Sequence, residues 1–387
     1  MHLCYKSAYM IKKIKSVTCL LVLLMSCMSM ETTKAPCFIS IEKFILVKRG
    51  RYEQTKEYIS FSNSGTAMGF MAPEEEFYIW IEETSTNISS CNWFVVLSDY
   101  KQIGDIRLKP GKHMYKITAP LNSYIQLIKA TEAVVGEVRI YGLQLHRPYL
   151  QTETILADLK KIQFIGNSIT CGYGNMVSVP APPDGNPLTG FHPANENAYM
   201  SYAMQTARKL NADPMLVSYS GKGVYRNFDG DTNETLPQIY DRIHLHDKNS
   251  LFWDHANQIP DIIVINLGTN DYFGESQNQP LNDTVFVHRY IAFVDRLSTY
   301  YPKAQIICAN GSMLNDGWPE GKKCWTRIQE NLKKVQEHFQ AKGNTKIYTF
   351  FFTPQQGPYG EDFHPSLATH TKMAEELTTF IQTVVNK

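Results

Sequence analysis

The sequence predicts an all-β sandwich over residues 37–149, followed by an α/β domain with a parallel sheet over residues 160–387. The first observation behind this is a series of short aromatic and β-branched segments without helical period in the N-terminal half. The second is a change near residue 160, after which apolar runs alternate with segments of helical period. The third is size, because 387 residues with a hydrophobic fraction of 43% can bury more than one core.

The N-terminal segments are bounded by residues that favour turns. Ser, Asn and Gly occupy residues 62–65, and Lys-Pro-Gly-Lys occupies residues 109–112. Several short strands at this spacing are typical of a β-sandwich. We expect strands at 77–81, 93–97, 113–117 and 138–141.

The C-terminal pattern predicts strands that are buried on both faces, because their apolar runs are continuous. Strand–helix alternation implies right-handed crossovers and a parallel sheet, whose ligands bind at the carboxyl ends of the strands. The loops after the strands are therefore where chemistry is expected. The expected strands are 162–165, 215–219, 262–266, 304–309 and 347–352, and the expected helices are 197–209, 285–300, 322–340 and 367–384.

Polar, glycine-rich blocks follow the first three of these strands, and a fourth block stands near the C-terminus. They are Gly166-Asn167-Ser168, the Gly221/Gly223 turn, Gly268-Thr269-Asn270-Asp271 and Asp362-Phe363-His364-Pro365. In this order the blocks resemble those of the SGNH (GDSL-type) hydrolases. With the β-rich N-terminal half, the sequence SGKGVYRN at 220–227 and His-Pro-Ser at 364–366, the chain is similar to carbohydrate esterase family two. That family joins a jelly-roll β-domain to a three-layer SGNH hydrolase domain and removes acetyl groups from plant-wall polysaccharides.

The resemblance implies roles that acyl transfer requires. Ser168 would be the nucleophile and His364 the general base. The oxyanion hole would comprise the Ser168 N–H, a backbone N–H of the turn from Gly221 to Gly223, and the Asn270 side-chain amide. Position in the block favours Gly221 slightly over Gly223. The alternatives are that Ser168 caps the following helix, that Asn270 stabilises its own turn, and that His364 is a surface loop residue.

The group that orients His364 is left open. SGNH hydrolases usually place an Asp three residues before the His, and here that position is Glu361, whereas Asp362 stands two residues before it. A backbone carbonyl that accepts the Nδ1–H could fix the same tautomer. Glu361, Asp362 and a Ser-His dyad with carbonyl support all remain candidates.

The residues that contact substrate, and the need for a cofactor, are inferred less directly from the sequence. Tyr225 and Arg226 come directly after the oxyanion glycines and should border the cleft, and Trp318 and Trp325 could stack on a sugar ring. Packing in the core or at the rim is the alternative for each tryptophan. No metal or cofactor is expected, because His244 and His246 have no third ligand nearby in sequence.

The N-terminus has the pattern of an export signal. A lysine-rich start precedes an apolar run at 17–25 that is too short to span a bilayer, so we expect a signal peptide over residues 1–26. Leu-Met-Ser-Cys at 24–27 resembles a bacterial lipobox, which makes Cys27 a lipidation site; ordinary cleavage slightly downstream is the alternative. The expected location is therefore exported: periplasmic, or anchored to the outer membrane as a lipoprotein.

Charge and cysteine usage narrow the possible partners. Lys+Arg 38 against Asp+Glu 37 gives a net charge of +1, and removal of residues 1–26 would discard four lysines and leave −3. A chain without excess positive charge is not expected to bind nucleic acid. In an oxidising compartment Cys37 and Cys91 could form a disulfide, or both could be free thiols.

The function expected from these features is an exported serine esterase that removes O-acetyl groups from xylan or glucomannan through an acetyl-serine intermediate. One alternative is an SGNH lipase or arylesterase of broader specificity. Another is a carbohydrate-binding lipoprotein whose hydrolase site is degenerate. The sequence leaves the oligomeric state open.

Overall fold

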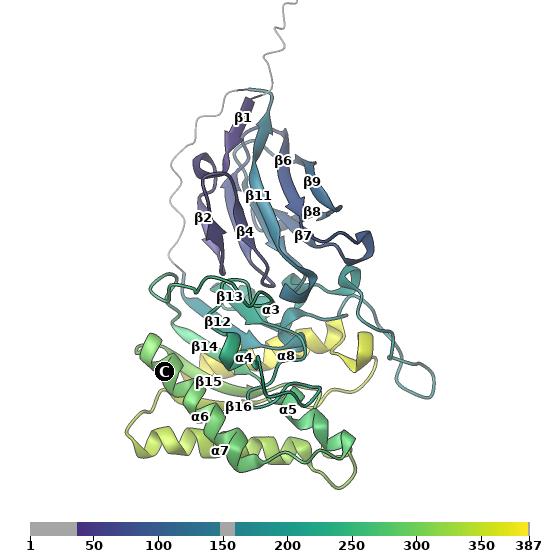
Figure 1. Cartoon of the computed structure of the whole chain (residues 1–387), viewed down its shortest axis with the longest axis vertical. Helices are drawn as coiled ribbons and strands as arrows, with labels where there is room; N and C mark the ends of the chain where they lie inside the picture. Colours follow the sequence, from purple (N-terminus) through teal and green to yellow (C-terminus); the bar gives the residue numbers. More distant parts are fainter. Residues whose placement is uncertain (1–36, 148–158, 386–387) are drawn as a thin grey trace, which may run out of the picture. The chain divides into compact units, whose positions relative to one another are not determined.

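The computed structural model describes residues 37–147 and 159–385 (Figure 1). The N-terminal half forms two antiparallel sheets, and the C-terminal half forms a five-stranded parallel sheet with helices on both faces. The predicted fold class is confirmed. The domain limits 37–149 and 160–387 stay predictions, while the signal peptide and Cys27 lie outside the described residues.

The β-sandwich packs its two sheets through alternating side chains. In β6 the residues Phe77, Ile79 and Ile81 are buried, whereas Tyr78 and Trp80 face outward. One sheet has the order β3-β4-β11-β6-β9, with β1 paired to β11, and the other has the order β2-β5-β10-β7-β8. The strands are β1 (Cys37–Ser40), β2 (Val47–Arg49), β3 (Glu53–Gln54), β4 (Ile59–Phe61), β5 (Ala67–Met71), β6 (Glu76–Glu83), β7 (Trp93–Ser98), β8 (Lys101–Arg107), β9 (Gly111–Thr118), β10 (Tyr124–Lys129) and β11 (Val138–Leu145).

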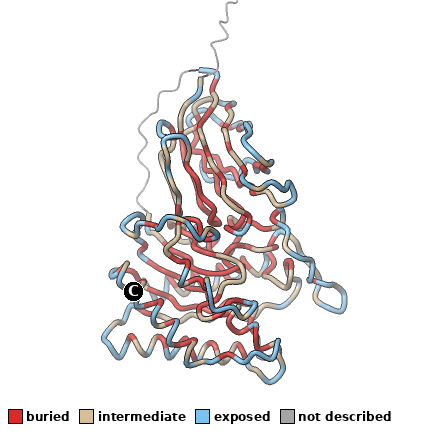
Figure 2. Tube along the Cα trace, viewed as in Figure 1, coloured by how far each residue is buried: buried red, intermediate tan, exposed pale blue. Residues whose placement is uncertain are grey.

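The parallel sheet has the strand order β13-β12-β14-β15-β16. The strand β12 is in register with both neighbours, β13 and β14, so that Gly166 stands opposite Ser218 on one side and Asn266 on the other. The carboxyl ends that precede the polar blocks therefore lie in one row. Figure 2 shows the strands β12 and β14 as mostly buried. The bounds of the parallel strands are β12 (Lys161–Gly166), β13 (Asp213–Ser218), β14 (Ile262–Asn266), β15 (Gln305–Asn310) and β16 (Ile347–Phe351).

Helices cover the parallel sheet in two layers. On one face α6 and α7 contribute Phe286, Tyr290 and Ile328 to a hydrophobic core, and on the other α3 and α8 contribute Tyr202 and Leu377 to a second core. The bounds are α2 (Ser168–Cys171), α3 (Tyr202–Lys209), α4 (Leu236–Ile239), α5 (Thr269–Phe273), α6 (Asp283–Tyr300), α7 (Cys324–Ala341) and α8 (Leu367–Phe380), with a π-helical turn at Ile381–Val385. Short 3-10 helices lie at Ile41–Lys43, Ile88–Ser90, Ala133–Val135, Pro193–Asn195, Ala198–Met200, Gly274–Gln277 and Glu361–Phe363.

The sandwich packs directly against the α/β half. Trp93, which is 2% exposed, shares a core with the parallel sheet, and its indole N–H donates to the Pro193 carbonyl at 3.0 Å. The Arg107 guanidinium lies 3.7 Å from the centre of the Trp93 ring. Trp93 is therefore a packing residue, as its place in an apolar run indicates.

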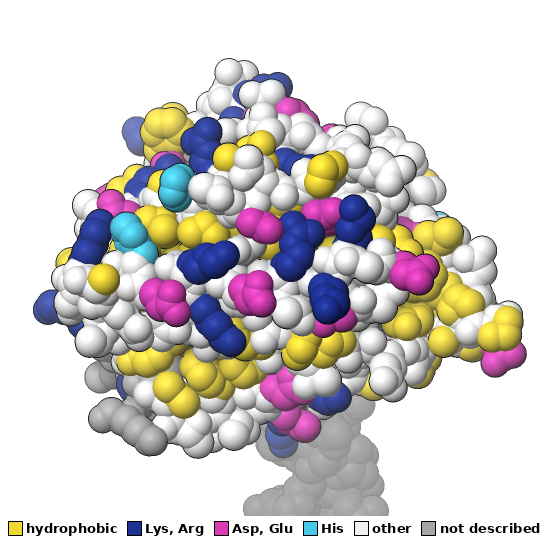
Figure 3. Space-filling model, turned by 90° about the horizontal axis from the view of Figure 1, so that it is seen from below, with side chains coloured by type: hydrophobic (Ala, Val, Ile, Leu, Met, Phe, Trp, Pro, Cys, Tyr) yellow, Lys and Arg dark blue, Asp and Glu magenta, His cyan; other side chains and the backbone are white. Residues whose placement is uncertain are grey.

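Surface charge and cysteine state complete the description. On the face of Figure 3, which carries α7, lysines and arginines are interspersed with acidic side chains, as on a solvated helix surface. The described cysteines form no disulfide, and Cys171, Cys308 and Cys324 are buried thiols. Within residues 37–147 and 159–385, no helix combines the length and the apolar character needed to span a bilayer.

Candidate active site

Ser168 and His364 come from opposite ends of the α/β half and meet at the carboxyl end of the sheet. Ser168 Oγ lies 2.8 Å from His364 Nε2, and Ser168 is 7% exposed. The serine is the first residue of α2, directly after β12. At Gly166 a Cβ atom would lie 2.0 Å from Thr170 Oγ1, so only glycine permits the tight turn into α2.

Asn167, not Ser168, caps the helix. The Asn167 side chain accepts a hydrogen bond from the Ile169 N–H at 3.2 Å. The alternative in which Ser168 is only a cap is therefore wrong. Its hydroxyl is left to pair with His364.

The imidazole of His364 is held by a backbone carbonyl and an aromatic ring. Nδ1 lies 3.0 Å from the Glu361 carbonyl, which accepts the Nδ1–H and leaves Nε2 as the acceptor for the serine proton. The Tyr173 ring stacks on the imidazole with centres 4.0 Å apart and an interplanar angle of 22°. Burial lowers the pKa of His364 to about 4, so the ring is neutral and able to act as a base near pH 7.

Neither candidate carboxylate hydrogen-bonds to the imidazole. The Glu361 carboxylate accepts from Asn195 Nδ2 at 2.6 Å, and it contacts the N–H and Nδ1 of His192 at 3.1 and 2.8 Å. The Asp362 carboxylate accepts from the Tyr173 hydroxyl at 2.5 Å. It also accepts from the N–H groups of Thr189 and Gly190, each at 3.0 Å. The geometry corrects the assignment of either side chain as the direct partner of His364.

The two carboxylates instead hold a strained turn. Asp362 and Phe363 have φ values of 48° and 60°, a region that costs non-glycine residues free energy. Hydrogen bonds from the 173–195 region to Asp362 and Glu361 stabilise this turn, which presents the Glu361 carbonyl to the imidazole. Glu361 and Asp362 are therefore positioning residues.

The three oxyanion donors predicted from the sequence follow three neighbouring strands: Ser168 follows β12, the turn from Gly221 to Gly223 follows β13, and Asn270 follows β14. Gly221 has a φ of 77°, and within the described residues neither its N–H nor that of Ser168 donates to a protein acceptor. The Gly223 N–H is already bound to Asn227 Oδ1 at 3.3 Å, which favours Gly221 as the donor. Asn270 Nδ2 donates one hydrogen to the Lys222 carbonyl at 2.9 Å, so the amide lies beside this turn and retains a second hydrogen.

Asp271 anchors the chain that follows the turn. Its buried carboxylate accepts from the N–H groups of Val224, Tyr225 and Arg226 at 2.7 to 3.2 Å. Burial raises the pKa of Asp271 to about 6, against the opposing effect of these donors. Asp271 and Tyr173 were not assigned from the sequence. Asp271 adjoins Asn270 in a block that had been singled out, whereas Tyr173 gave no signal.

The substrate-contacting candidates divide into two groups. Trp318 is 57% exposed, and Tyr225 is half-buried beside the oxyanion turn. Arg226 is buried and donates to the carbonyls of Asp271 and Gln279, so its assignment as a substrate ligand is corrected to that of a loop support. Trp325 packs against the core and donates to the Phe352 carbonyl, which likewise corrects its assignment.

An exposed aromatic row extends from the oxyanion turn. A Cβ atom at Gly221 would lie 2.8 Å from Phe228. The Phe228 ring lies 6.5 Å from that of Phe273, which in turn lies 6.4 Å from the Trp318 ring. These three side chains are 52%, 37% and 57% exposed, so an apolar surface borders the site.

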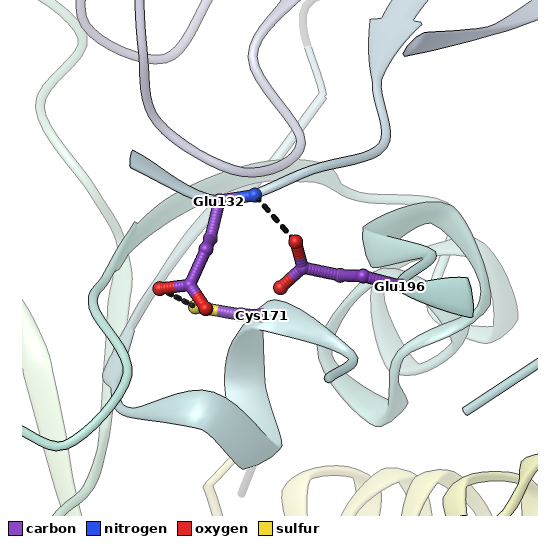
Figure 4. Close-up of side chains that lie close together, drawn as sticks. All are labelled: Glu132, Cys171 and Glu196. Atoms are coloured by element: carbon purple, nitrogen blue, oxygen red, sulfur yellow. Dashed lines mark hydrogen bonds between the residues drawn. The ribbon is translucent and has the colours of Figure 1, made fainter. Parts of the chain in front are cut away.

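One group of side chains in the described residues has metal-ligand spacing. Atoms of Glu132, Cys171 and Glu196 lie within 4.8 Å of one another, and all three residues are buried (Figure 4). Glu132 already binds Ser220, and Glu196 Oε2 accepts the Glu132 N–H at 2.8 Å. Lys129 is buried nearby and interacts electrostatically with both carboxylates. The Glu132 carboxylate and Glu196 Oε2 therefore already have protein partners, whereas Glu196 Oε1 has none among the described residues.

A serine paired with a neutral histidine beside unpaired backbone N–H groups is the arrangement of a serine hydrolase. Residues 164–372 match the GDSL-like lipase/acylhydrolase family. A crystallised family two carbohydrate esterase from Clostridium thermocellum, in complex with cellohexaose, is 30% identical with a TM-score of 0.76, over 88% of this chain and 99% of that one. The chain belongs to the GDSL-like family and, within it, to the family two carbohydrate esterases, and it is a carboxylic ester hydrolase.

Two further relatives carry activity names. The chain is 33% identical to the cellulase/esterase CelE of Acetivibrio thermocellus over 82% of its own length, but spans only 38% of that relative. It is 27% identical to an acetylxylan esterase/glucomannan deacetylase of Cellvibrio japonicus, over 79% of both chains. The chain is therefore acetylxylan esterase-like.

Asp362→Asn tests the positioning role. The Asn carbonyl oxygen can still accept from Thr189 and Gly190, so we expect kcat/KM for 4-nitrophenyl acetate to fall less than about 10-fold. In Ser-His-Asp enzymes, where the carboxylate binds the imidazole directly, the same replacement lowers kcat by about 10⁴-fold. His364→Ala, which removes the base, is the reference for full loss. A loss in Asp362→Asn approaching that reference would show that the carboxylate acts on the imidazole directly.

The acid limb of the pH profile tests the state of His364. Because burial lowers the pKa of His364 to about 4, kcat/KM should rise with pH around that value rather than around the ordinary value near 6.5. Tyr173→Ala uncovers the ring and should move the limb upward, with circular dichroism confirming a folded chain at each pH. A wild-type midpoint of about 6.5 or higher would contradict the burial effect.

Proposed function

We propose that this chain removes O-acetyl groups from a plant-wall polysaccharide, xylan or glucomannan. The observation that carries the proposal is the 2.8 Å separation of Ser168 Oγ and His364 Nε2, together with N–H groups of Ser168 and Gly221 that donate to no acceptor in the described part of the chain. The activities for which the Cellvibrio relative is named, acetylxylan esterase and glucomannan deacetylase, support the substrate class.

In the first half-reaction Ser168 Oγ attacks the acetyl carbonyl carbon while His364 Nε2 takes the hydroxyl proton. The oxyanion that forms accepts hydrogen bonds from the N–H groups of Ser168 and Gly221 and from Asn270 Nδ2. As the C–O bond to the sugar breaks, His364 returns the proton to the departing sugar oxygen. The products of this step are a free sugar hydroxyl and an acetyl ester on Ser168.

In the second half-reaction a water molecule replaces the sugar. His364 Nε2 accepts a proton from the water as its oxygen attacks the acetyl-serine carbonyl. The same donors stabilise the second oxyanion, and the proton returns to Ser168 Oγ when acetate leaves. Throughout the cycle the Glu361 carbonyl keeps Nδ1 protonated, so that only Nε2 exchanges protons.

The aromatic row supplies a surface on which the sugar backbone can lie. Trp318 stands at one end of this row, and the ring of Phe228 lies against the oxyanion turn at the other. Sugar rings present C–H faces that stack on aromatic side chains while their hydroxyls stay in water. The same apolar surface could hold a long acyl chain, so a lipase or arylesterase of broader specificity is the alternative.

We also propose that the chain is exported and carries lipid on Cys27. The basic start, the apolar run at 17–25 and the Leu-Met-Ser-Cys sequence support this. A lipid at Cys27 would tether the catalytic part to a membrane surface without a spanning helix.

Ser168→Ala tests the esterase proposal. We expect acetate release from acetylated xylan and acetylated glucomannan to fall by at least about 10³-fold, because the nucleophile is removed while the fold is kept. The wild type should hydrolyse 4-nitrophenyl acetate and reject 4-nitrophenyl octanoate. Undiminished acetate release in the variant would exclude the mechanism, and a preference for octanoate would favour a lipase.

Cys27→Ser tests the anchor. After expression in a bacterium grown with labelled palmitate, we expect label in the full-length wild-type chain and none in the variant, because only a cysteine at this position can carry the lipid. Mass spectrometry of the mature chain should place its first residue at 27. Equal labelling of both chains, or an unlabelled wild type cleaved further downstream, would contradict the proposal.

A further inference from the structure

A buried carboxylate of the β-sandwich contacts the catalytic half at the oxyanion turn. Glu132 follows β10, and its carboxylate accepts from the Ser220 N–H at 2.8 Å and from the Ser220 hydroxyl. Ser220 directly precedes Gly221. Glu132 is fully buried, so no water competes for these bonds.

The same carboxylate also reaches the nucleophile helix. Cys171, the last residue of α2, lies with its Sγ 3.8 Å from Glu132 Oε2 and donates to Ser218 Oγ at 3.3 Å. Ser168 is the first residue of that four-residue helix. Glu132 therefore contacts both α2, through Cys171 (Figure 4), and the turn that carries Gly221, through Ser220.

Glu132 is itself held firmly. Its N–H donates to Glu196 Oε2 at 2.8 Å, and its carbonyl accepts from Lys129 Nζ at 3.1 Å. Lys129 Nζ also donates to the carbonyl and hydroxyl of Thr131. The backbone on either side of the carboxylate is thus fixed by buried polar contacts.

Hydrogen-bond donors distinguish the two neighbouring carboxyl groups, those of Glu132 and Glu196. Glu132 receives two hydrogen bonds from Ser220, whereas Glu196 Oε1 has no partner among the described residues. Burial and the neighbouring Glu132 charge raise the pKa of Glu196 well above its ordinary value. Burial also raises the pKa of Glu132, but the two Ser220 donors oppose that rise, so the hydrogen bonds favour the charge on Glu132 over Glu196.

We propose that Glu132 is a positioning residue for the oxyanion hole, through which the β-sandwich sets the direction of the Gly221 N–H. The proposal rests on the esterase function proposed above. Oxyanion donors act by being aligned before the reaction, so a small rotation of the Ser220–Gly221 peptide weakens their bond to the transition state. Because the substrate carbonyl develops its charge only in the transition state, this loss should appear in kcat and not in KM.

Four variants assayed with 4-nitrophenyl acetate test the proposal. Glu132→Ala should lower kcat by about 10²-fold with KM within about 2-fold of wild type, which corresponds to the loss of one aligned oxyanion donor. Glu132→Gln keeps the shape and one acceptor oxygen and should recover part of the loss. Ser220→Ala should have a smaller effect, and combining it with Glu132→Ala should add nothing, because both act through one contact.

Glu83→Gln is the matched control. Glu83 is also a buried carboxylate of the sandwich, but it accepts hydrogen bonds from Ser85 and Asn92, which belong to the sandwich. We expect Glu83→Gln to keep the wild-type kcat. Thermal unfolding of each variant separates loss of folded enzyme from loss of turnover.

Two outcomes would overturn the proposal: a folded Glu132→Ala chain with wild-type kcat, or multiplicative losses in the Glu132→Ala/Ser220→Ala double variant. Failure of the esterase function itself looks different. In that case the wild type would not release 4-nitrophenol faster than Ser168→Ala. With wild-type turnover established first, each result on Glu132 bears on its positioning role alone.

Discussion

A backbone carbonyl orients the base in this protein, and much of the surrounding structure serves to place that one oxygen. The Glu361 carbonyl lies 3.0 Å from His364 Nδ1, which fixes the tautomer and aims Nε2 at Ser168. A backbone carbonyl cannot rotate on its own as a side chain can. Its direction toward the imidazole therefore depends on the conformation of the backbone around it. The two left-handed residues after Glu361 bend the chain, and the Glu361 and Asp362 carboxylates keep the bend in place.

This arrangement explains why the sequence predicted part of the site and not the rest. Ser168, His364 and the oxyanion turn were predicted because each belongs to a short block that follows a strand. The partner of His364 stayed open because a sequence does not show which way a side chain points. Glu361 and Asp362 both stand near the base, yet their carboxylates turn toward the 173–195 region. The direction of the Arg226 side chain was equally hidden in the sequence: its guanidinium donates to the Asp271 carbonyl.

The fold was more predictable than the site because hydrophobic period reports burial directly. The strand Ile262–Asn266 has the predicted bounds, and the other predicted strands of the parallel sheet differ by one or two residues at their ends. The pattern missed several elements. Among the helices, α2 and α5 are only four and five residues long, too short for a helical period. Among the strands, β1 to β5 and the buried β10 were not predicted. In the sandwich, β8 is exposed along most of its length, so it has no apolar pattern to read.

The contact between the two halves explains why a β-sandwich belongs to the site. Trp93 and neighbouring side chains share a core with the parallel sheet, and hydrophobic packing of this kind tolerates some sliding. The buried Lys129, Glu132 and Glu196 do not, because any shift would leave a charge or a polar atom without a partner in a region closed to water. Breaking one member of such a set costs about 3–5 kcal/mol, whereas an apolar replacement of the whole set can be neutral. The cluster of Lys129, Glu132 and Glu196 therefore contributes more to the relative position of the two halves than to stability. The position that it fixes is that of Ser220, which directly precedes Gly221.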